Sequence, residues 1–539
     1  MPELDVIIVG GGLTGTAIAR DAALRGLHTV LVEHKDLGAG ASGQVPELLD
    51  GGPLGCERPR RRRLQRELEA LRTIGGTLVQ RRHLLWLAEV NGGLLGAARC
   101  ATASQVLESG TAHEPWRVVD ASTRTLLEPA LTVGGGVLVT ASWSVLPQRL
   151  AVLNARDAED HGARLCVGWR ATDVIREGAR VVGLVAVEQR TGRTEALRAS
   201  VVVNATGAGL QLLAEQLGHR LPLRVVPRIF ACLDRRLSHC AVDLGGGLRL
   251  LPTPRASWLG PLAQVARSAG LHAPVTPDEM RQLRHAASRW IPAAREAPVI
   301  SLRVAAQARL GKTEDLRPAA ARAPRIVDHA DHGCAGMLSV VGGLALEQRW
   351  VAQRVVDRIA AGFPQARACT TQVSPLPGGR GRCDEERWVE QYPVAADTIE
   401  GLVQRHGSAT HDLLQQTEGL DRGATLVCRC AGITLAELRH AADHEHVNHL
   451  ADLLRRTEAG HGACLGARCL DRCARIWRAV GERSVVEMQQ ELAEVLRQRV
   501  VELGPHLTDT QVESLNLGWA GVISEPSGEA DPETTGEPK

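Results

Sequence analysis

Three glycines near the beginning of the chain have the spacing of a nucleotide-binding turn. Gly10, Gly12 and Gly15 satisfy the pattern G-x-G-x-x-G. The first glycine permits a tight turn, the second lets a pyrophosphate approach the backbone, and the third lets a helix pack closely. Glu33 follows 18 residues after Gly15, where a carboxylate can hold ribose hydroxyls. The spacing therefore predicts a dinucleotide site.

Four cysteines near the end of the chain have the spacing of a metal site. They form C-x-C, a gap of 33 residues and then C-x4-C, at Cys428, Cys430, Cys464 and Cys469. Four thiolates bind either a tetrahedral zinc ion or an iron–sulfur cluster. Zinc ribbons usually use C-x2-C pairs, whereas the spacing here better fits ligands spread over two irons. We therefore predict a [2Fe–2S] cluster, with zinc as the alternative and unliganded buried cysteines as a third interpretation.

Regular elements are expected to position both groups. Val6–Val9 is an apolar run typical of a buried parallel strand, and Leu13–Leu24 has helical periodicity. Between the cysteine pairs, Thr434 and Glu437 have the spacing of a capping box at a helix start. Four histidines follow on the same segment, and we expect them on a solvated helix face: His440, His444, His446 and His449.

Two later segments favour FAD over a nicotinamide cofactor. Alternating residues Val182–Val187, a turn at Thr191-Gly192 and a return strand predict a hairpin, followed by a strand ending in NATGAG. The stretch MLSVVGGLALEQR predicts another strand leading into a helix. In two-domain flavoproteins, later segments of this kind bring the chain back into contact with the cofactor. The complete set of expected FAD contacts is Gly10, Gly12, Leu13, Thr14, Gly15, Glu33, His34, Ser42, Gly43, Ala205, Thr206, Gly207, Gly342, Gly343 and Leu344.

Composition limits the remaining possibilities. A chain of 539 residues exceeds one usual core, and a net charge of +2 gives no electrostatic argument for nucleic acid as a partner. No apolar run long enough for a membrane-spanning helix occurs, and the acidic start of the chain does not resemble a secretory signal. We therefore expect a cytoplasmic protein with no transmembrane helix of its own.

The expected fold is α/β: a Rossmann-like FAD-binding domain with an inserted β-rich substrate domain, followed by a small helical cysteine domain. The nucleotide-binding segments are expected near 1–45, 165–215 and 335–362, and the substrate part, irregular in its pattern, at 215–330. The expected boundaries are 1–373 for the oxidoreductase domain, 374–423 for a helical connector, 424–480 for the cysteine domain, 481–522 for a helical segment and 523–539 for a disordered tail.

These motifs, in this order, resemble those of the FAD-dependent glycerol-3-phosphate dehydrogenases, and specifically the A subunit of the anaerobic bacterial enzyme. The most specific segments are LVCRCAGITLAEL and VNHLADLLRRTEAGHGACLGARC. In that family they form a [2Fe–2S] domain like bacterioferritin-associated ferredoxin. The resemblance implies a D-amino-acid-oxidase-like or glutathione-reductase-like fold, and oxidation of glycerol 3-phosphate to dihydroxyacetone phosphate. It also implies electron transfer to B- and C-like partner subunits and membrane quinone, with the chain peripheral on the inner face of the cytoplasmic membrane.

The substrate-side motifs depart from that family. Its His-Ser-Gly-x-Arg-Tyr stretch aligns with Asp50–Gly55, so the arginine falls on Leu54 and the tyrosine on Gly55. Its Gly-Gly-Lys motif becomes Gly342, Gly343 and Leu344, which lacks the lysine. Losing one charge-assisted phosphate contact costs about 1.5–3 kcal/mol.

Remaining arginines are the candidates for substrate binding. The resemblance matches Arg309 to a phosphate-binding arginine, and Arg349 and Arg228 are further candidates. We expect Arg309 and Arg349 to act in catalysis, and no general base is identifiable. The alternatives are an electron-transfer protein with a silent or altered substrate pocket, or a flavoprotein that oxidises amines or amino acids.

Overall fold

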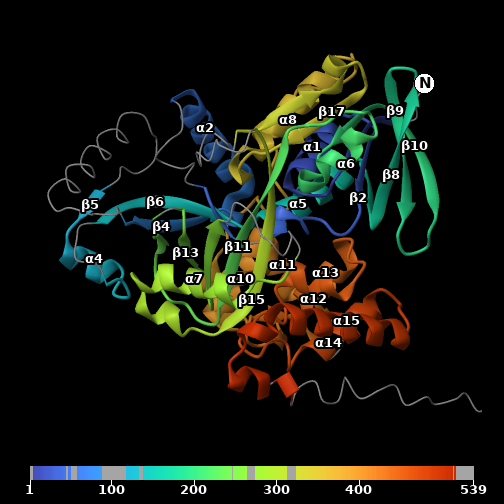
Figure 1. Ribbon diagram of the computed structural model, residues 1–539. Coiled ribbons are helices and arrows are strands. Elements are labelled where there is room, and N and C mark those ends of the chain that lie inside the picture. Colours follow the sequence, from blue (N-terminus) through green and yellow to red (C-terminus); the bar gives the residue numbers. More distant parts are fainter. Residues whose placement is uncertain are drawn as a thin grey trace, which may run out of the picture.

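The computed structural model describes residues 4–43, 46–49, 58–87, 117–132, 137–245, 247–263, 273–311, 323–418, 421–513 and 515–516. The substrate-side stretch Asp50–Gly55 and the predicted tail 523–539 lie outside these residues. Figure 1 shows two sheets, with a group of helices from the last part of the chain beside them.

The first sheet carries the glycine turn. Its strand order is β16-β17-β10-β1-β2-β7, with β8 and β9 joined through the long strand β10. All neighbours from β17 to β7 are parallel, whereas β16 is antiparallel to β17. Its strands are β1 Leu4–Val9, β2 Thr29–Glu33, β7 Arg164–Val167, β8 Trp169–Glu177, β9 Arg180–Glu188, β10 Thr194–Asn204, β16 Arg325–Asp328 and β17 Met337–Val341. The predicted hairpin is confirmed, but its return strand and the following buried strand are one continuous element.

Alternation of apolar residues makes this sheet the middle of three layers. Val6 and Ile8 of β1 pack against helices, whereas Ile7 and Val9 pack against the hairpin side. Because both faces are covered, the parallel strands are apolar throughout. The covering helices are α1 Leu13–Leu24, α5 Pro147–Asp160 and α8 Gln348–Ala360 on one face, and α6 Leu210–Glu215 on the other.

A second, mostly antiparallel sheet combines strands β11 to β15 of the predicted substrate part with strands β3 to β6 from earlier in the chain. Its order is β15-β11-β14-β13-β12-β4-β6-β3, with β5 on β6. The predicted β-rich substrate domain is confirmed, and the segment whose pattern is irregular contains two long paired strands, β11 and β15. The strands are β3 Glu47–Leu48, β4 Gln80–Trp86, β5 Arg117–Val119, β6 Val137–Val145, β11 Leu223–Leu233, β12 Ala241–Asp243, β13 Arg249–Pro252, β14 Ser257–Ala263 and β15 Val299–Leu310.

Three helices flank the second sheet. In α2, Leu64, Leu68 and Leu71 are buried in one core cluster, as the helical spacing of leucines indicates. Helix α7 begins with a capping box at Thr276 and packs its apolar side on the sheet. Their bounds are α2 Arg58–Gly75, α4 Ala121–Leu127 and α7 Pro277–Ser288.

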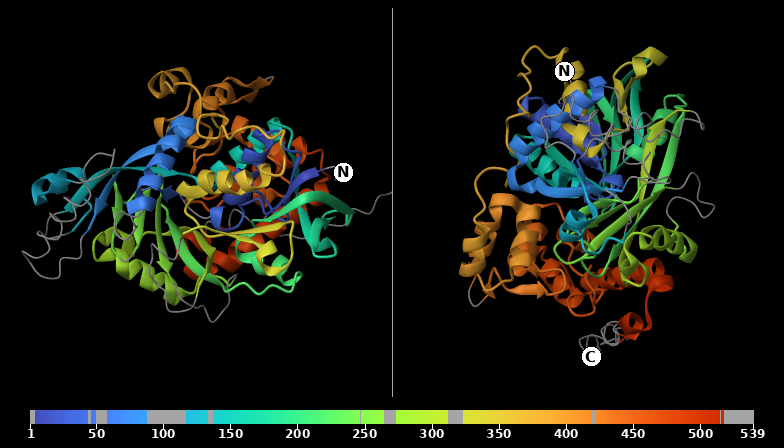
Figure 2. Two further views of the ribbon diagram at one scale, coloured as in Figure 1. Left: turned by 90° about the horizontal axis from the view of Figure 1, so that it is seen from above. Right: turned by 90° about the vertical axis from the view of Figure 1, so that its left-hand side faces the viewer.

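The last part of the chain is mainly helical. A connector with its own small core around Trp388 precedes the cysteine segment. Figure 2 shows the connector and the later helices together along one side of the molecule. The elements are α9 Glu385–Gln391, α10 Ala396–His406, α11 Thr410–Gln415, β18 Thr417–Glu418, β19 Asp421–Arg422, β20 Leu426–Cys428, β21 Ile433–Thr434, α12 Leu435–His444, α13 Leu450–Thr457, α14 Leu470–Val480 and α15 Val485–Leu503.

The cysteine segment is packed into the body of the molecule. Its apolar residues, among them Leu438, Leu453 and Trp477, share one core cluster with Leu302 and Ala305 of β15. Among the described helices, none is both long and apolar enough to cross a membrane.

Candidate functional site

The predicted cofactor segments meet at one edge of the parallel sheet. Gly10 follows β1, Glu33 ends β2, Ala205 follows β10, and Gly342 follows β17. The strands are in register there, since Val9 lies opposite both Val32 and Asn204. The carboxyl ends of neighbouring parallel strands are where doubly wound sheets bind nucleotides.

The glycine turn leaves no room for side chains. Gly10 has a φ of +111°, and a Cβ there would lie 2.7 Å from the carbonyl oxygen of Ala205. A Cβ on Gly15 would collide with the carbonyl of Gly10. Beside Gly12, by contrast, the nearest atom to a Cβ is Ser42 Oγ at 3.5 Å. The turn is therefore tight on its protein side and open at the second glycine, where a pyrophosphate has to approach.

Side chains around the turn match an adenosine diphosphate group. The Glu33 carboxylate is buried and accepts hydrogen bonds from the backbone N–H of Gly11 at 2.6 Å and of Lys35 at 2.7 Å. His34 Nδ1 lies 3.0 Å from Glu33 Oε1. Ser42 Oγ accepts from the N–H of Leu13, the first residue of α1, at 3.0 Å. This places a carboxylate at the ribose position and a helix N-terminus at the phosphate position.

The two later segments form turns at the same edge. Asn204 donates to the carbonyl of Leu210 at 2.9 Å and accepts from the Thr206 hydroxyl at 2.6 Å, which fixes the turn through Gly207. Gly342 and Gly343 both have positive φ, +75° and +100°. These turns allow the backbone to approach a flavin closely. The residues thus fit FAD along its length.

The four predicted cysteines come together as two pairs. Cys428 and Cys469 are within hydrogen-bonding distance of each other, as are Cys430 and Cys464. The two loops touch, because a Cβ on Gly462 would collide with the Cys430 side chain. Cys473, one helical turn after Cys469, also contacts Cys469.

Backbone donors surround these sulfurs. The N–H groups of Gly460 and Ala431 point at Cys428, and those of Arg468 and Gly466 point at Cys464. A hydrogen bond from Cys430 lowers the pKa of Cys464 to about 5, against the effect of burial. Backbone N–H groups stabilise sulfur in its deprotonated form, which is the form that binds metal.

Arginines gather on one face of the substrate sheet. Arg224 lies opposite Arg309, and Arg228 lies opposite Ala305, in the antiparallel pairing of β11 and β15. Directly opposed residues share a face, so these three arginines lie on the same side. Arg303 of β15 belongs to this face and donates to the Gly43 carbonyl at 2.6 Å. The face is therefore turned toward the predicted cofactor loop.

Arg349 lies elsewhere, in a buried ion pair. Its guanidinium donates to both oxygens of Glu67, at 2.6 and 2.7 Å, and also to Gln353 and Thr371. Only 4% of the residue is exposed. These contacts join α8 to α2 and leave the guanidinium committed to protein partners, so the structure does not bring Arg349 together with Arg309.

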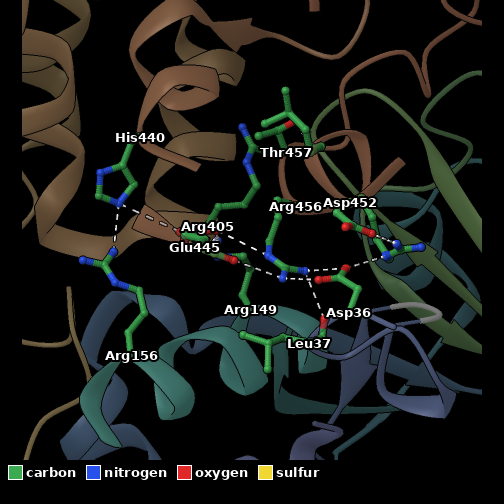
Figure 3. A network of polar contacts seen from close by, with 12 residues as sticks. Asp36, Leu37, Arg149, Arg156, Arg405, His440, Glu445, Asp452, Arg456 and Thr457 are labelled. Carbon is green, nitrogen blue, oxygen red and sulfur yellow. Dashed lines mark hydrogen bonds and ion pairs between the residues drawn. The ribbon is translucent and has the colours of Figure 1, made fainter. Parts of the chain in front are cut away.

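A network of charged residues connects the cofactor loop to the cysteine segment (Figure 3). Arg456 of α13 donates to the Asp36 carboxylate at 2.8 Å and to the carbonyl of Leu37 at 3.0 Å. Arg149 of α5 donates to Glu445 at 2.7 Å. Asp36 follows Glu33 by three residues, so the last part of the chain holds the loop beside the ribose position. No sequence signal linked these residues, because each partner lies hundreds of positions away.

The histidines after Thr434 divide between this network and solvent. His444 and His449 are exposed, as expected, but His440 Nε2 lies 2.9 Å from Arg156 and 3.9 Å from the buried Glu445. Burial lowers the pKa of His440 to about 3. The expected solvated face is therefore wrong for His440, because α12 packs this side onto α5 and the connector.

The class of protein follows from this arrangement. The parallel sheet carries a dinucleotide turn, and two later segments of the chain form turns at the same edge. Together with the second, mostly antiparallel sheet, these features define a two-domain flavin oxidoreductase. The predicted fold class is confirmed in this respect.

Comparison with known proteins supports this class. The family "FAD dependent oxidoreductase" matches residues 5–349, and the chain belongs to it. Residues 369–483 match "C-terminal domain of alpha-glycerophosphate oxidase". The A subunit of the anaerobic glycerol-3-phosphate dehydrogenase of Escherichia coli K12 is 29% identical over 508 residues, which is 92% of each chain. The A1 subunit of the Haloferax volcanii enzyme is 28% identical over 87% of this chain and 82% of that protein.

Solved structures show the same fold. Glycerol-3-phosphate dehydrogenase from Bacillus halodurans, complexed with FAD, superimposes with a TM-score of 0.70 at 19% identity, covering 94% of this chain and 96% of that one. Glycine oxidase from Geobacillus kaustophilus gives a TM-score of 0.54 at 20% identity and covers 69% of this chain and 98% of that one. The resemblance drawn from the motifs is confirmed.

Proposed function

We propose that the chain is the flavin-bearing subunit of a dehydrogenase that oxidises glycerol 3-phosphate to dihydroxyacetone phosphate. The observation that carries the proposal is the extent of the similarity to A subunits of the anaerobic enzyme, over 92% of both chains in one case. This alignment includes the flavin domain and most of the cysteine segment. FAD, when bound, accepts the hydride from C2 of the substrate.

The arginine face would bind the substrate phosphate. Arg309, Arg224 and Arg228 lie on the same face of β11 and β15. Arg224 and Arg309 are directly opposed, so both can bind one phosphate dianion. They offer donors in place of the family's arginine and lysine, whose positions are occupied here by Leu54 and Leu344. Arg349 has a different role in this proposal: it holds α8 against α2 through Glu67.

The four paired cysteines would bind a [2Fe–2S] cluster. In a tetrahedral zinc site with Zn–S bonds of about 2.3 Å, all four sulfurs lie about 3.8 Å apart. Among the described residues, no three cysteine sulfurs lie within 4.8 Å of one another. Two pairs, Cys428 with Cys469 and Cys430 with Cys464, match two ligands on each of two irons. Zinc remains the alternative.

Electrons would leave through partner subunits. The relatives are named as A subunits of their enzymes, which supports the presence of partner subunits. B- and C-like partners, a quinone acceptor and a peripheral position on the inner face of the cytoplasmic membrane are part of this proposal through the family resemblance. We also propose the boundaries 1–373, 374–423, 424–480 and 481–522. The start of the second family match at residue 369 supports the first boundary, and its end at 483 supports the third.

Anaerobic titration tests the substrate. Glycerol 3-phosphate is added to the purified protein with FAD bound, and the oxidised-flavin absorbance is followed, with dithionite to show that the flavin is reducible. Bleaching supports the proposal. The Arg309→Gln variant is expected to need about ten- to a hundredfold more substrate for the same bleaching. No bleaching by glycerol 3-phosphate, together with bleaching by an amino acid, would reassign the substrate class.

Metal analysis tests the cluster. We expect two irons and two acid-labile sulfides per chain, and their loss in Cys464→Ser. Cys473→Ala is the matched control and should retain both, because Cys473 lies outside the two pairs. Stoichiometric zinc without sulfide would show the zinc alternative instead.

A further inference from the structure

A cavity lies where five parts of the molecule meet. Its walls come from the cofactor loop, the N-terminal end of α5, the substrate sheet at Trp258, the connector helix α10 and the end of α13. It encloses about 350 Å³, including the part open to solvent. Of this space, about 20 Å³ is open to the centre of a water molecule, and one water needs about 10–15 Å³ on that measure, so the enclosed part suits a small ion and is too small for a nucleotide.

Arginines dominate its lining. Every part except the cofactor loop supplies at least one, and the lining contains one carboxylate, that of Glu458. The five guanidinium groups belong to Arg149, Arg303, Arg405, Arg455 and Arg456. Four of these groups have buried carboxylate partners, so Arg303 is the one whose charge is met by no hydrogen-bonded carboxylate among the described residues. A cavity lined by guanidinium N–H donors, with one such arginine among them, favours an anionic ligand.

Several of these guanidinium groups also form ion pairs with carboxylates that do not line the cavity. Arg405 donates to Glu437 at 2.5 Å, and Arg455 donates to Asp36 at 3.0 Å and Asp452 at 2.7 Å. These contacts fix the guanidinium planes, so a ligand would meet donors that are already oriented.

Arg303 differs from the others. Within the described part of the chain its guanidinium has one hydrogen bond, to the Gly43 carbonyl, and it lies beside the Trp258 ring at 5.1 Å. Its remaining N–H groups are thus without a protein acceptor among these residues. Burial lowers the pKa of Arg303, and Glu458 opposes that effect. An anion in the cavity would supply a negative counter-charge to the Arg303 guanidinium.

The cavity is separate from the arginines proposed to hold the substrate. Arg303 and Arg309 are six residues apart on β15, which corresponds to about 20 Å along a strand. Arg309 does not line the cavity, and neither does Arg224.

We propose that this junction binds a compact oxyanion of the phosphate class, either free inorganic phosphate or the phosphate group of a small metabolite. The ion accepts hydrogen bonds from Arg303 on the substrate sheet and from Arg149, Arg405 and Arg455 on the other parts. Its binding joins the cofactor loop to the cysteine segment. The proposal does not depend on the identity of the oxidised substrate.

Calorimetric titration of the FAD-loaded protein tests the site. Inorganic phosphate is the first ligand and glycerol 3-phosphate the second, with wild type, Arg303→Gln, Arg455→Gln and Arg309→Gln compared at constant ionic strength. We expect phosphate affinity to fall about ten- to a hundredfold in the first two variants and to persist in Arg309→Gln. Arg281→Gln, on an exposed surface, is the matched control.

The outcomes separate the two anion sites. Phosphate binding that disappears in Arg309→Gln but is unchanged in Arg303→Gln and Arg455→Gln would overturn the proposal and assign all binding to the substrate face. Absence of phosphate binding in the FAD-loaded wild type would also overturn it. If glycerol 3-phosphate binds to Arg309→Gln but not to Arg455→Gln, the occupant is the phosphate group of a metabolite. If inorganic phosphate shows this pattern and glycerol 3-phosphate does not, the occupant is the free ion. The FAD content and melting temperature of each variant show that it is folded.

Discussion

The ion pair between Asp36 and Arg456 gives the sharpest prediction. Both side chains are fully buried, at 0% exposure. Asp36→Asn removes the carboxylate charge while keeping the shape, and leaves the Arg456 guanidinium buried without its main counter-charge. Breaking a buried pair on one side costs about 3–5 kcal/mol. Arg455 also loses its contact with Asp36, so the upper end of that range applies.

The resulting change in melting temperature depends on what unfolds. Unfolding entropy is about 2.1 cal/mol/K per residue, which gives roughly 1.1 kcal/mol/K for all 539 residues. If the chain unfolds as one unit, the melting temperature should fall by about 3–4 °C. If residues 421–516 unfold alone, the same loss should lower their own transition by about 15–25 °C.

Scanning calorimetry of the FAD-loaded protein distinguishes the two cases. Glu177→Gln is the control, since Glu177 and Arg198 form an exposed pair at 2.7 Å whose loss should cost less than about 1 kcal/mol. A second readout is the pKa of Asp452, which burial and the charge of Asp36 raise to about 6 and which should fall in Asp36→Asn. If Asp36→Asn melts like Glu177→Gln, the reasoning about this pair is refuted.

Three other predictions concern separate parts of the molecule. Burial and the neighbouring His219 lower the pKa of His329 to about 4, so the unfolded chain takes up a proton at a higher pH than the folded one. The free energy of unfolding should therefore fall by up to about 1.4 kcal/mol per pH unit as the pH drops from 6.5 to 4. Urea unfolding of wild type and His329→Asn measures this dependence, and equal pH slopes for the two proteins would contradict it. Gly15→Val should abolish FAD binding, because its side chain would collide with the Gly10 carbonyl, and a yellow holoprotein would show that the turn is not tight. Arg349→Met should lower stability by about 3–5 kcal/mol by leaving Glu67 buried and unpaired, and a raised KM for glycerol 3-phosphate without any loss of stability would restore Arg349 to the substrate site.

The cofactor edge was predictable because its signals are local. The strand, the glycine turn, the helix Leu13–Leu24 and Glu33 lie within about thirty residues, and each shows in the pattern of side chains. Helix α1 has the predicted bounds. The β-rich character of the substrate part was predicted, but its individual strands were not, because β11 and β15 carry arginines on one face and their alternation does not resemble a strand with an apolar inner face.

The cysteine segment shows where local signals stop. Thr434 caps α12 as expected, accepting from the N–H of Glu437 at 3.3 Å. The Glu437 carboxylate does not complete the capping box, because it binds Arg405 and His406 of the connector. Burial alone would raise the pKa of Glu437, but these two partners lower it to about 2. A long-range ion pair here replaced the local contact that spacing favours.

The contact between Asp36 and Arg456 also sets an order of events during synthesis. The two residues are 420 positions apart. At about 5–20 residues per second, a ribosome needs roughly 20–80 seconds to proceed from one to the other. After Leu344 the three cofactor segments have been synthesised, and for the 112 residues from there to Arg456 the flavin edge lacks the arginines that hold the adjoining loop. The residues of the cofactor edge are thus complete before the contacts that fasten the adjoining loop can form.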